Sequence, residues 1–203
     1  MKSKNEILDR IYNLSGEPDE CVCAYKDWAG TYDEDTLGGM NYVGPRVAAA
    51  HLAKLLNPSA MVLDAGCGTG LVGVELADLG FKTIDGLDIS AEMLSQASKK
   101  GPYRNLQRED MTQPLSYNTA AYDAVICVGT FTHAHVGPKG FNELIRVTKA
   151  GGPLVATIHE EVWSDGYEEH FKHLEAEGIA SVKSISDEAY HINRCKLVTL
   201  EVA

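Results

Sequence analysis

Residues 61–70 read MVLDAGCGTG, and this stretch decides the fold. Its apolar start at 61–63 predicts a short buried strand, and a helix is predicted over 70–79. The glycines between them permit positive φ and let a ligand approach the backbone closely, while the helix N-terminus offers free N–H groups. The stretch therefore predicts a strand–loop–helix unit with a ligand at the loop.

Short apolar runs and helical segments alternate along the chain. Strands are predicted at 61–63, 81–88, 104–108, 122–128, 153–158, 180–186 and 196–202. Helices are predicted at 5–14 with Ser3 and Glu6 as a capping box, at about 24–33, at 44–56, at 70–79, at 90–99 with Ser90 as N-cap, from Pro138 to before Gly151, and from Ser164 to Gly178.

This alternation predicts a parallel sheet with helices on both faces. The last two strands have no long helix between them, so they are expected to pair as a hairpin at a mixed sheet edge. The predicted fold is α/β and doubly wound, with a seven-stranded mixed sheet whose terminal strand is antiparallel.

Composition narrows the class of protein. The 203 residues suit one domain, and the formal net charge of −11 argues against a nucleic-acid partner. No apolar stretch approaches the ~20 residues that span a bilayer, and the first residues lack the apolar centre of a signal peptide. Five cysteines without a Cys-x-x-Cys pair indicate free thiols. We therefore expect a cytoplasmic protein with no membrane partner.

The acidic residues around the loop indicate which ligand binds there. Asp88 ends the second predicted strand 22 residues after Gly66, where a carboxylate can accept both hydroxyls of a ribose. A dinucleotide fingerprint would need glycine at 71, which is Leu71 here, and this spacing argues against an NAD-dependent oxidoreductase. Asp64 would repel a pyrophosphate but suits a cationic amine. The pattern favours a nucleoside that carries an amino group.

Four motifs occur in order: DAGCGTG at 64–70, GLDIS at 86–90 with Met93, EDM at 109–111, and CVG at 127–129. Together they resemble the class I, Rossmann-like S-adenosylmethionine-dependent methyltransferases, over roughly residues 25–160. The resemblance implies that the amino-acid end of the cofactor S-adenosylmethionine is held by Asp64, Ala65, Gly66, Cys67, Gly68 and Gly70. It also implies that Asp88 binds the ribose, that Ile89 and Met93 lie beside the adenine, that Asp110 with Met111 meets the adenine amino group, and that Cys127, Val128 and Gly129 line the cofactor.

The segment before the core completes the resemblance. Residues 25–33, YKDWAGTYD, are similar to a segment that folds over the cofactor in small-molecule methyltransferases, which implies cofactor contacts from Tyr25, Trp28 and Tyr32. For Tyr25 and Trp28, packing of a helix onto the core is an equal alternative. We expect a helical lid at 1–44, ordered by the cofactor over residues 1–40, and a methyltransferase domain at 45–203.

The acceptor side is less defined by sequence. His133, after the fourth strand, is the candidate base or acceptor-positioning residue, ahead of His159 and of His135, which precedes the helix start at Gly137-Pro138. His133 and His135 alternate sides in an extended segment, so no metal site is expected. Residues 128–131 read VGTF in place of the Asn/Asp-Pro-Pro-aromatic motif of family members that methylate exocyclic amino groups of bases or glutamine amides. This favours a small-molecule acceptor, the alternative being a cofactor-binding module with little or no turnover.

Overall fold

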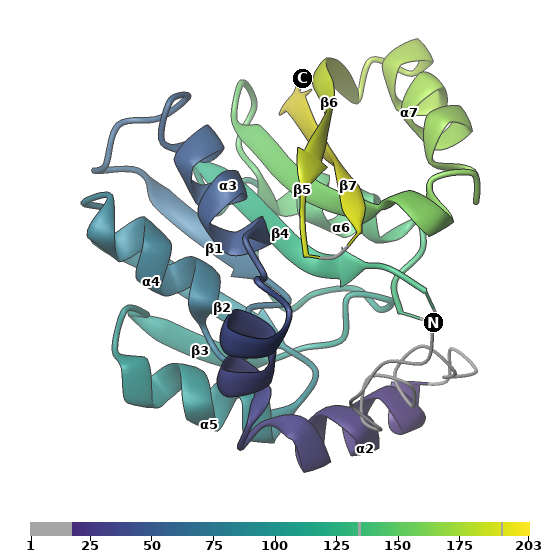
Figure 1. Ribbon diagram of the computed structural model, residues 1–203. Helices are drawn as coiled ribbons and strands as arrows, with labels where there is room; N and C mark the ends of the chain where they lie inside the picture. Colours follow the sequence, from purple (N-terminus) through teal and green to yellow (C-terminus); the bar gives the residue numbers. More distant parts are fainter. Residues whose placement is uncertain (1–17, 134, 192) are drawn as a thin grey trace.

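The computed structural model describes residues 18–133, 135–191 and 193–203, and these form one sheet with strand order β3-β2-β1-β4-β5-β7-β6 (Figure 1). The strands are β1 (Met61–Ala65), β2 (Thr83–Asp88), β3 (Asn105–Arg108), β4 (Ala124–Phe131), β5 (Pro153–His159), β6 (Ala180–Ala189) and β7 (Arg194–Val202). Strand β7 is antiparallel to both β5 and β6. The predicted seven-stranded mixed sheet with an antiparallel terminal strand is confirmed.

The helices follow the predicted order with shifted ends. They are α2 (Pro18–Trp28), the π-helix η1 (Glu34–Gly39), α3 (Gly44–Leu52), α4 (Leu71–Asp78), α5 (Ala91–Lys100), α6 (Gly140–Val147), the short 3₁₀ helix η2 (Glu160–Val162) and α7 (Tyr167–Ala176). The Ser90 hydroxyl accepts from Met93 N–H and caps α5 as predicted. The helix predicted at 5–14 lies outside the described residues.

Two predicted helix starts were wrong. The helix expected at about 24–33 already includes Pro18, the first described residue, and it ends at Trp28. Helix α7 begins after Gly166, which has φ 92° and turns the chain; Ser164 is therefore not its cap. Both errors leave the order of the elements unchanged.

Alternate residues of the central strands face opposite layers. Val62 and Ile126 pack with α3 and α4, whereas Leu63 and Val125 pack with α6 and α7. Figure 1 shows α5 beside α4. Strand β1 lies between β2 and β4, so the chain leaves β1 toward one edge and later returns to the other. The carboxyl ends of β1 and β4 therefore form the switch point at which such sheets bind ligands.

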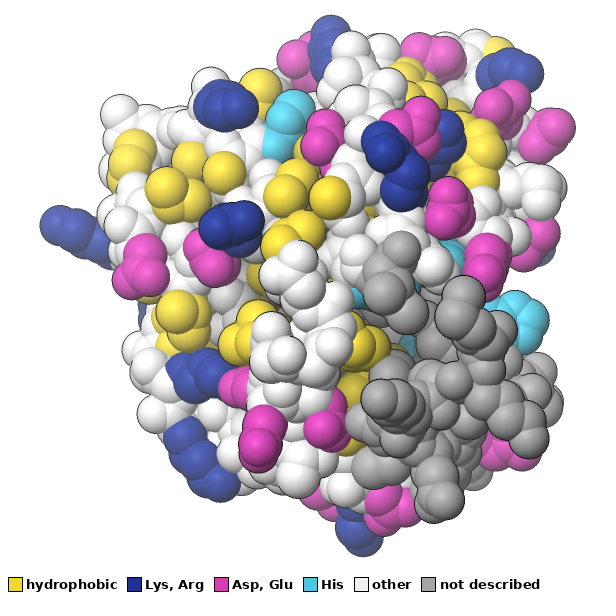
Figure 2. Space-filling model, viewed as in Figure 1, with side chains coloured by type: hydrophobic (Ala, Val, Ile, Leu, Met, Phe, Trp, Pro, Cys, Tyr) yellow, Lys and Arg dark blue, Asp and Glu magenta, His cyan; other side chains and the backbone are white. Residues whose placement is uncertain are grey.

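The surface carries charges of both signs. Figure 2 shows Lys and Arg side chains scattered among Asp and Glu on the face in view. No helix within the described residues has the length and apolar character to cross a membrane. The described cysteines, Cys23, Cys67, Cys127 and Cys195, are free thiols, as predicted.

Candidate functional site

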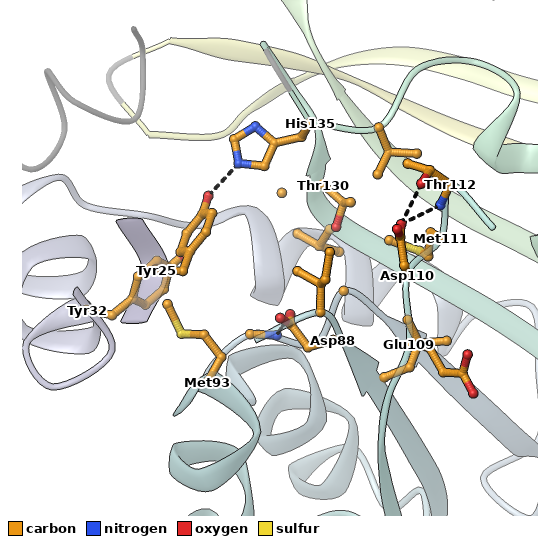
Figure 3. A pocket seen from close by; sticks show the side chains of 17 residues that line it. Tyr25, Tyr32, Asp88, Met93, Glu109, Asp110, Met111, Thr112, Thr130 and His135 are labelled. Atoms are coloured by element: carbon orange, nitrogen blue, oxygen red, sulfur yellow. Dashed lines mark hydrogen bonds between the residues drawn. The ribbon is translucent and has the colours of Figure 1, made fainter. Parts of the chain in front are cut away.

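A cavity of about 830 Å³ lies at the switch point, against the carboxyl ends of β1, β2 and β4 (Figure 3). Its walls come from the glycine loop, from the turns after β2 and β3, from the end of β4, and from Tyr25 and Tyr32 of the N-terminal segment. The sheet topology thus brings together residues that the sequence separates by more than a hundred positions.

The glycine loop makes one wall. Gly66 has φ +73°, and a Cβ there would collide with the Thr130 hydroxyl on β4. The N–H groups of Gly66 and Cys67 donate to the Leu87 carbonyl at 2.9 and 2.8 Å, which ties the loop to β2. Glycine is therefore required at 66 both for its dihedral angle and for the close approach of β4.

Asp88 is fixed at the end of β2. Its Oδ2 accepts from Gly68 N–H at 2.9 Å and its Oδ1 from Ser90 N–H at 2.9 Å. Burial raises the pKa of Asp88, while the backbone hydrogen bonds lower it in part. Each oxygen keeps a further lone pair, so a carboxylate held in this way can accept hydroxyl groups from a ligand in the cavity.

Asp64 is fully buried directly before the loop. Its Oδ2 accepts from the Tyr103 hydroxyl at 2.6 Å, whereas its Oδ1 has no hydrogen-bond partner among the described residues. Burial, helped by the charge of Asp88, raises the pKa of Asp64 to about 7, although the Tyr103 hydrogen bond lowers it. A buried acceptor without a donor is costly, and a cationic amine at the loop would satisfy it.

The turn after β3 forms the opposite wall. Asp110 Oδ1 accepts from Thr112 N–H at 2.8 Å and from its hydroxyl at 2.7 Å, which holds the turn in shape (Figure 3). Met111 is buried beside it and, with Ile89 and Met93, lines the cavity. Flat apolar walls next to a carboxylate suit an aromatic base with an exocyclic amine.

The N-terminal segment contacts the core at three points. The Tyr25 hydroxyl lies 3.0 Å from His135 Nε2, and both side chains line the cavity (Figure 3). Asp33 accepts from Thr69 Oγ1 at 2.5 Å and pairs with Lys100 Nζ at 2.6 Å. Lys26 and Glu92 form a longer, exposed pair at 3.8 Å. The turn after α2 thus contacts the glycine loop, while α2 itself contacts α5 and the segment after β4.

The structure separates the predicted cofactor residues into two groups. Those that line the cavity are Tyr25, Tyr32, Gly66, Gly68, Asp88, Ile89, Met93, Asp110, Met111, Val128 and Gly129. Those that do not line it are Trp28, Asp64, Ala65, Cys67, Gly70 and Cys127. Cys127 points into the core, and Trp28 donates to Asp35 Oδ2 at 2.8 Å and lines a neighbouring cavity.

The histidine prediction needs correction. His133 is exposed and does not line the cavity, whereas His135, ranked below it from sequence, does. The chain after β4 turns, with Thr132 N–H donating to the Thr130 carbonyl at 3.0 Å, so the extended alternation assumed for this segment is absent. His135 Nδ1 lies 2.6 Å from the His133 carbonyl, which assigns the proton to Nδ1 and leaves Nε2 as the acceptor for Tyr25.

Other lining residues were missed or not assigned to the cofactor: Leu87, Glu109, Thr112, Thr130 and Val136. Glu109 and Thr112 flank the motif at 109–111, so proximity to the motif could have identified them. Val136 and His135 had no such signal. Within the described residues, no group of three or more His, Cys, Asp or Glu side chains is arranged to hold a metal ion.

Comparison with known proteins points to one chemistry. Residues 62–152 match the family described as "Methyltransferase domain". Human Methyltransferase-like protein 27 is 37% identical over 158 residues, which is 75% of this chain and 64% of that protein. The demethylmenaquinone methyltransferase of Beutenbergia cavernae is 29% identical over 145 residues, covering 70% of this chain and 59% of that protein.

A further relative acts on RNA. The 18S rRNA (guanine(1575)-N(7))-methyltransferase of Saccharomyces cerevisiae is 30% identical over 115 residues, covering 51% of this chain and 42% of that protein. This chain therefore spans less than two thirds of the length of each of these relatives.

Among solved structures, magnesium protoporphyrin IX methyltransferase from Synechocystis PCC 6803 with bound S-adenosylmethionine shares the fold. Its TM-score is 0.63 at 17% identity, with all of both chains covered.

Proposed function

This chain belongs to the Rossmann-like S-adenosylmethionine-dependent methyltransferases, and from this premise we propose that it transfers a methyl group from S-adenosylmethionine to a small-molecule acceptor. The observation that carries the proposal is the placement of Asp88 and the glycine loop on one cavity at the switch point of the sheet. The relatives named above are all methyltransferases, which does not favour a binding module without turnover.

The described residues fit this cofactor. Asp88 would accept the ribose hydroxyls, Asp110 would accept from the adenine amino group, and Ile89 and Met93 would pack on the adenine. Asp64, whose buried Oδ1 has no donor among the described residues, lies behind the loop and would attract the cationic amino group electrostatically. S-adenosylmethionine supplies a methyl group activated by its cationic sulfur, so the protein has to align the acceptor and exclude water.

Several features support a small-molecule acceptor. Tyr25 and His135 both line the cavity and contact each other at 3.0 Å, and Gly129 lies near the end of β4, where an acceptor would approach. The net charge of −11 disfavours a polyanionic acceptor, although one relative methylates rRNA.

His135 takes the acceptor-side role predicted for His133. Burial lowers the pKa of His135, so at neutral pH its Nε2 is free of a proton and accepts from Tyr25. A cytoplasmic location remains part of the proposal.

Titration of the protein with S-adenosylhomocysteine and, separately, with NADH tests the cofactor assignment. We expect calorimetry to detect only S-adenosylhomocysteine, and binding of NADH alone would overturn the assignment. A screen of metabolite extracts with labelled S-adenosylmethionine then tests turnover. Labelled product at low molecular mass is the expected result, and label found only in RNA would contradict the acceptor class.

Binding of S-adenosylhomocysteine should strengthen as the pH rises through the pKa of Asp64, which is about 7. A cationic amine favours the ionised carboxylate; below this pKa the carboxyl carries a proton that binding must displace. Each pH unit below it therefore weakens binding by up to about tenfold. Calorimetry at pH 6, 7 and 8 measures the effect, and buffers of different ionisation enthalpy detect the released proton. Asp64→Asn should bind more weakly with little pH dependence; equal affinity of the unsubstituted protein at all three pH values would contradict the role.

We also propose that residues 1–44 act as a lid over the cofactor, followed by the methyltransferase domain at 45–203. Segments held by few contacts open more easily than the core. Amides in 18–40 should gain hydrogen-exchange protection when S-adenosylhomocysteine binds, whereas amides of β5, away from the cavity, should not change. Equal protection of 18–40 with and without ligand would contradict the lid.

A further inference from the structure

A second cavity, of about 490 Å³, adjoins the first. Tyr25, Tyr32 and Gly129 line both, so these residues form the wall between them. The second cavity is otherwise lined by residues from α2, η1 and its following turn, the end of β4, and the chain between β6 and β7. Molecules bound in the two cavities would meet at Gly129.

Aromatic rings make most of this second wall. Tyr42 and Tyr190 lie edge to face with centroids 5.0 Å apart, and Trp28 and Tyr32 do the same at 4.6 Å. His191 lies 4.7 Å from the Tyr190 ring. Ring edges and faces that are already fixed in place favour a flat aromatic guest, because stacking adds to the burial of its surface.

Among the described residues that line this cavity there is no Lys, Arg, Asp or Glu. Burial and the neighbouring His159 lower the pKa of His191 to about 4, so it is neutral at physiological pH. An anionic guest would lose its hydration without gaining a counter-charge. An ammonium guest would also lose its hydration, and the ring faces would offset only part of that cost. A protonated nitrogen, moreover, has no lone pair with which to attack a methyl group.

Polar groups in the cavity gather near Gly129. A Cβ on Gly129 would lie 2.8 Å from the Tyr42 hydroxyl and 3.1 Å from that of Tyr190. Tyr42 donates its hydroxyl proton to Tyr190 Oη at 3.3 Å, so the Tyr42 oxygen presents lone pairs at the boundary. Burial raises the pKa of Tyr42 well above its usual value, which keeps this group a neutral phenol.

We propose that the second cavity is the acceptor site and that it takes an uncharged aromatic amine, with an N–H of the nitrogen donated to the Tyr42 hydroxyl oxygen. This inference rests on the proposed function. The nitrogen lone pair forms the bond to the methyl carbon while the carbon–sulfur bond breaks toward sulfur. The methylated nitrogen is then an ammonium, which loses one proton to water as the product leaves. Tyr42 is a positioning residue that directs the lone pair toward Gly129.

Three naphthalene derivatives that differ in charge test the ligand class with S-adenosylhomocysteine at saturation: 1-naphthylamine, which is neutral at pH 7.5, 1-naphthylmethylamine, which is a cation, and 1-naphthoate, an anion. Ligand-observed NMR should show that the neutral amine binds at least about tenfold more tightly than either charged compound. Tighter binding of the cation or the anion would overturn the assignment. So would no binding of any of the three by protein that binds S-adenosylhomocysteine.

Two further variants place the guest in the cavity. Met40 lines only the second cavity, so Met40→Trp should abolish 1-naphthylamine binding and leave S-adenosylhomocysteine binding unchanged. Leu37→Trp is the matched control, because Leu37 is 51% exposed in the same segment and lines neither cavity. Tyr42→Phe should weaken 1-naphthylamine about fivefold, as expected for one hydrogen bond, without affecting naphthalene. Unchanged amine binding in Met40→Trp would show that the guest lies elsewhere.

The outcomes separate the two proposals. If the unsubstituted protein does not bind S-adenosylhomocysteine, the cofactor assignment itself is overturned. Intact S-adenosylhomocysteine binding with no preference for the neutral amine would overturn only the acceptor class. A product of 1-naphthylamine heavier by one CH₂ unit in mass spectrometry, formed with S-adenosylmethionine and absent in Met40→Trp, would support both.

Discussion

Replacing Asp88 with alanine should weaken S-adenosylhomocysteine binding on the order of 100-fold, or about 2.8 kcal/mol. The carboxylate is fixed by Gly68 and Ser90 N–H groups at 2.9 Å each, and Asp88 lines the cavity. Its removal leaves the ribose hydroxyls without their charged acceptors and frees the loop N–H of Gly68. Calorimetric titration measures the affinity, and thermal unfolding reports whether the fold persists.

The matched control for this variant is Asp187→Ala. Asp187 is a carboxylate on β6 that pairs with Lys196 at 2.7 Å, away from the cavity. An exposed pair of this kind contributes little to stability, and its loss should not alter binding. Equal affinities of Asp88→Ala and the unsubstituted protein would show that the end of β2 does not bind the ribose.

Replacing Gly66 with alanine should both destabilise the fold and abolish cofactor binding. The backbone at 66 has φ +73°, which costs a residue with a Cβ roughly 1–2 kcal/mol. The added Cβ also collides with the Thr130 hydroxyl, so the loop or the end of β4 has to move. Both segments line the cavity, and their displacement should remove S-adenosylhomocysteine binding from the measurable range in calorimetry.

Gly101→Ala separates the two causes. Gly101 has a similar φ of +77°, an added Cβ there would meet no described residue within 4 Å beyond its chain neighbours, and it lies outside the cavity. The free energy of unfolding of Gly101→Ala should fall only by the cost of the backbone conformation, about 1–2 kcal/mol, as measured by chemical denaturation. Its affinity for S-adenosylhomocysteine should be unchanged. If Gly66→Ala behaves like Gly101→Ala in both measurements, the loop does not need to approach β4 closely.

Sequence alone determined the architecture because the signals that carry it are local. Strand and helix periodicity, Ser90 as a cap and the glycine loop each depend on a few neighbouring residues, and the alternation of strands and helices fixes a doubly wound sheet. Asp88 and Asp110 were expected at one edge of the sheet because each follows a parallel strand, and both line the cavity there. The start of α7 was predicted wrongly because it depends on the turn at Gly166.

Only the tertiary structure decided which side chains share a cavity. His135 lines the first cavity in place of His133 because the chain turns after β4, and its partner Tyr25 is 110 residues away in sequence. The second cavity joins η1 and its following turn to the chain between β6 and β7, and no local pattern encodes the contact of Tyr42 with Tyr190. Such contacts depend on how loops from distant strands meet above the sheet. The residue pattern thus specified the glycine loop and the acidic residues at one edge of the sheet, whereas packing of distant loops specified the second cavity beside them.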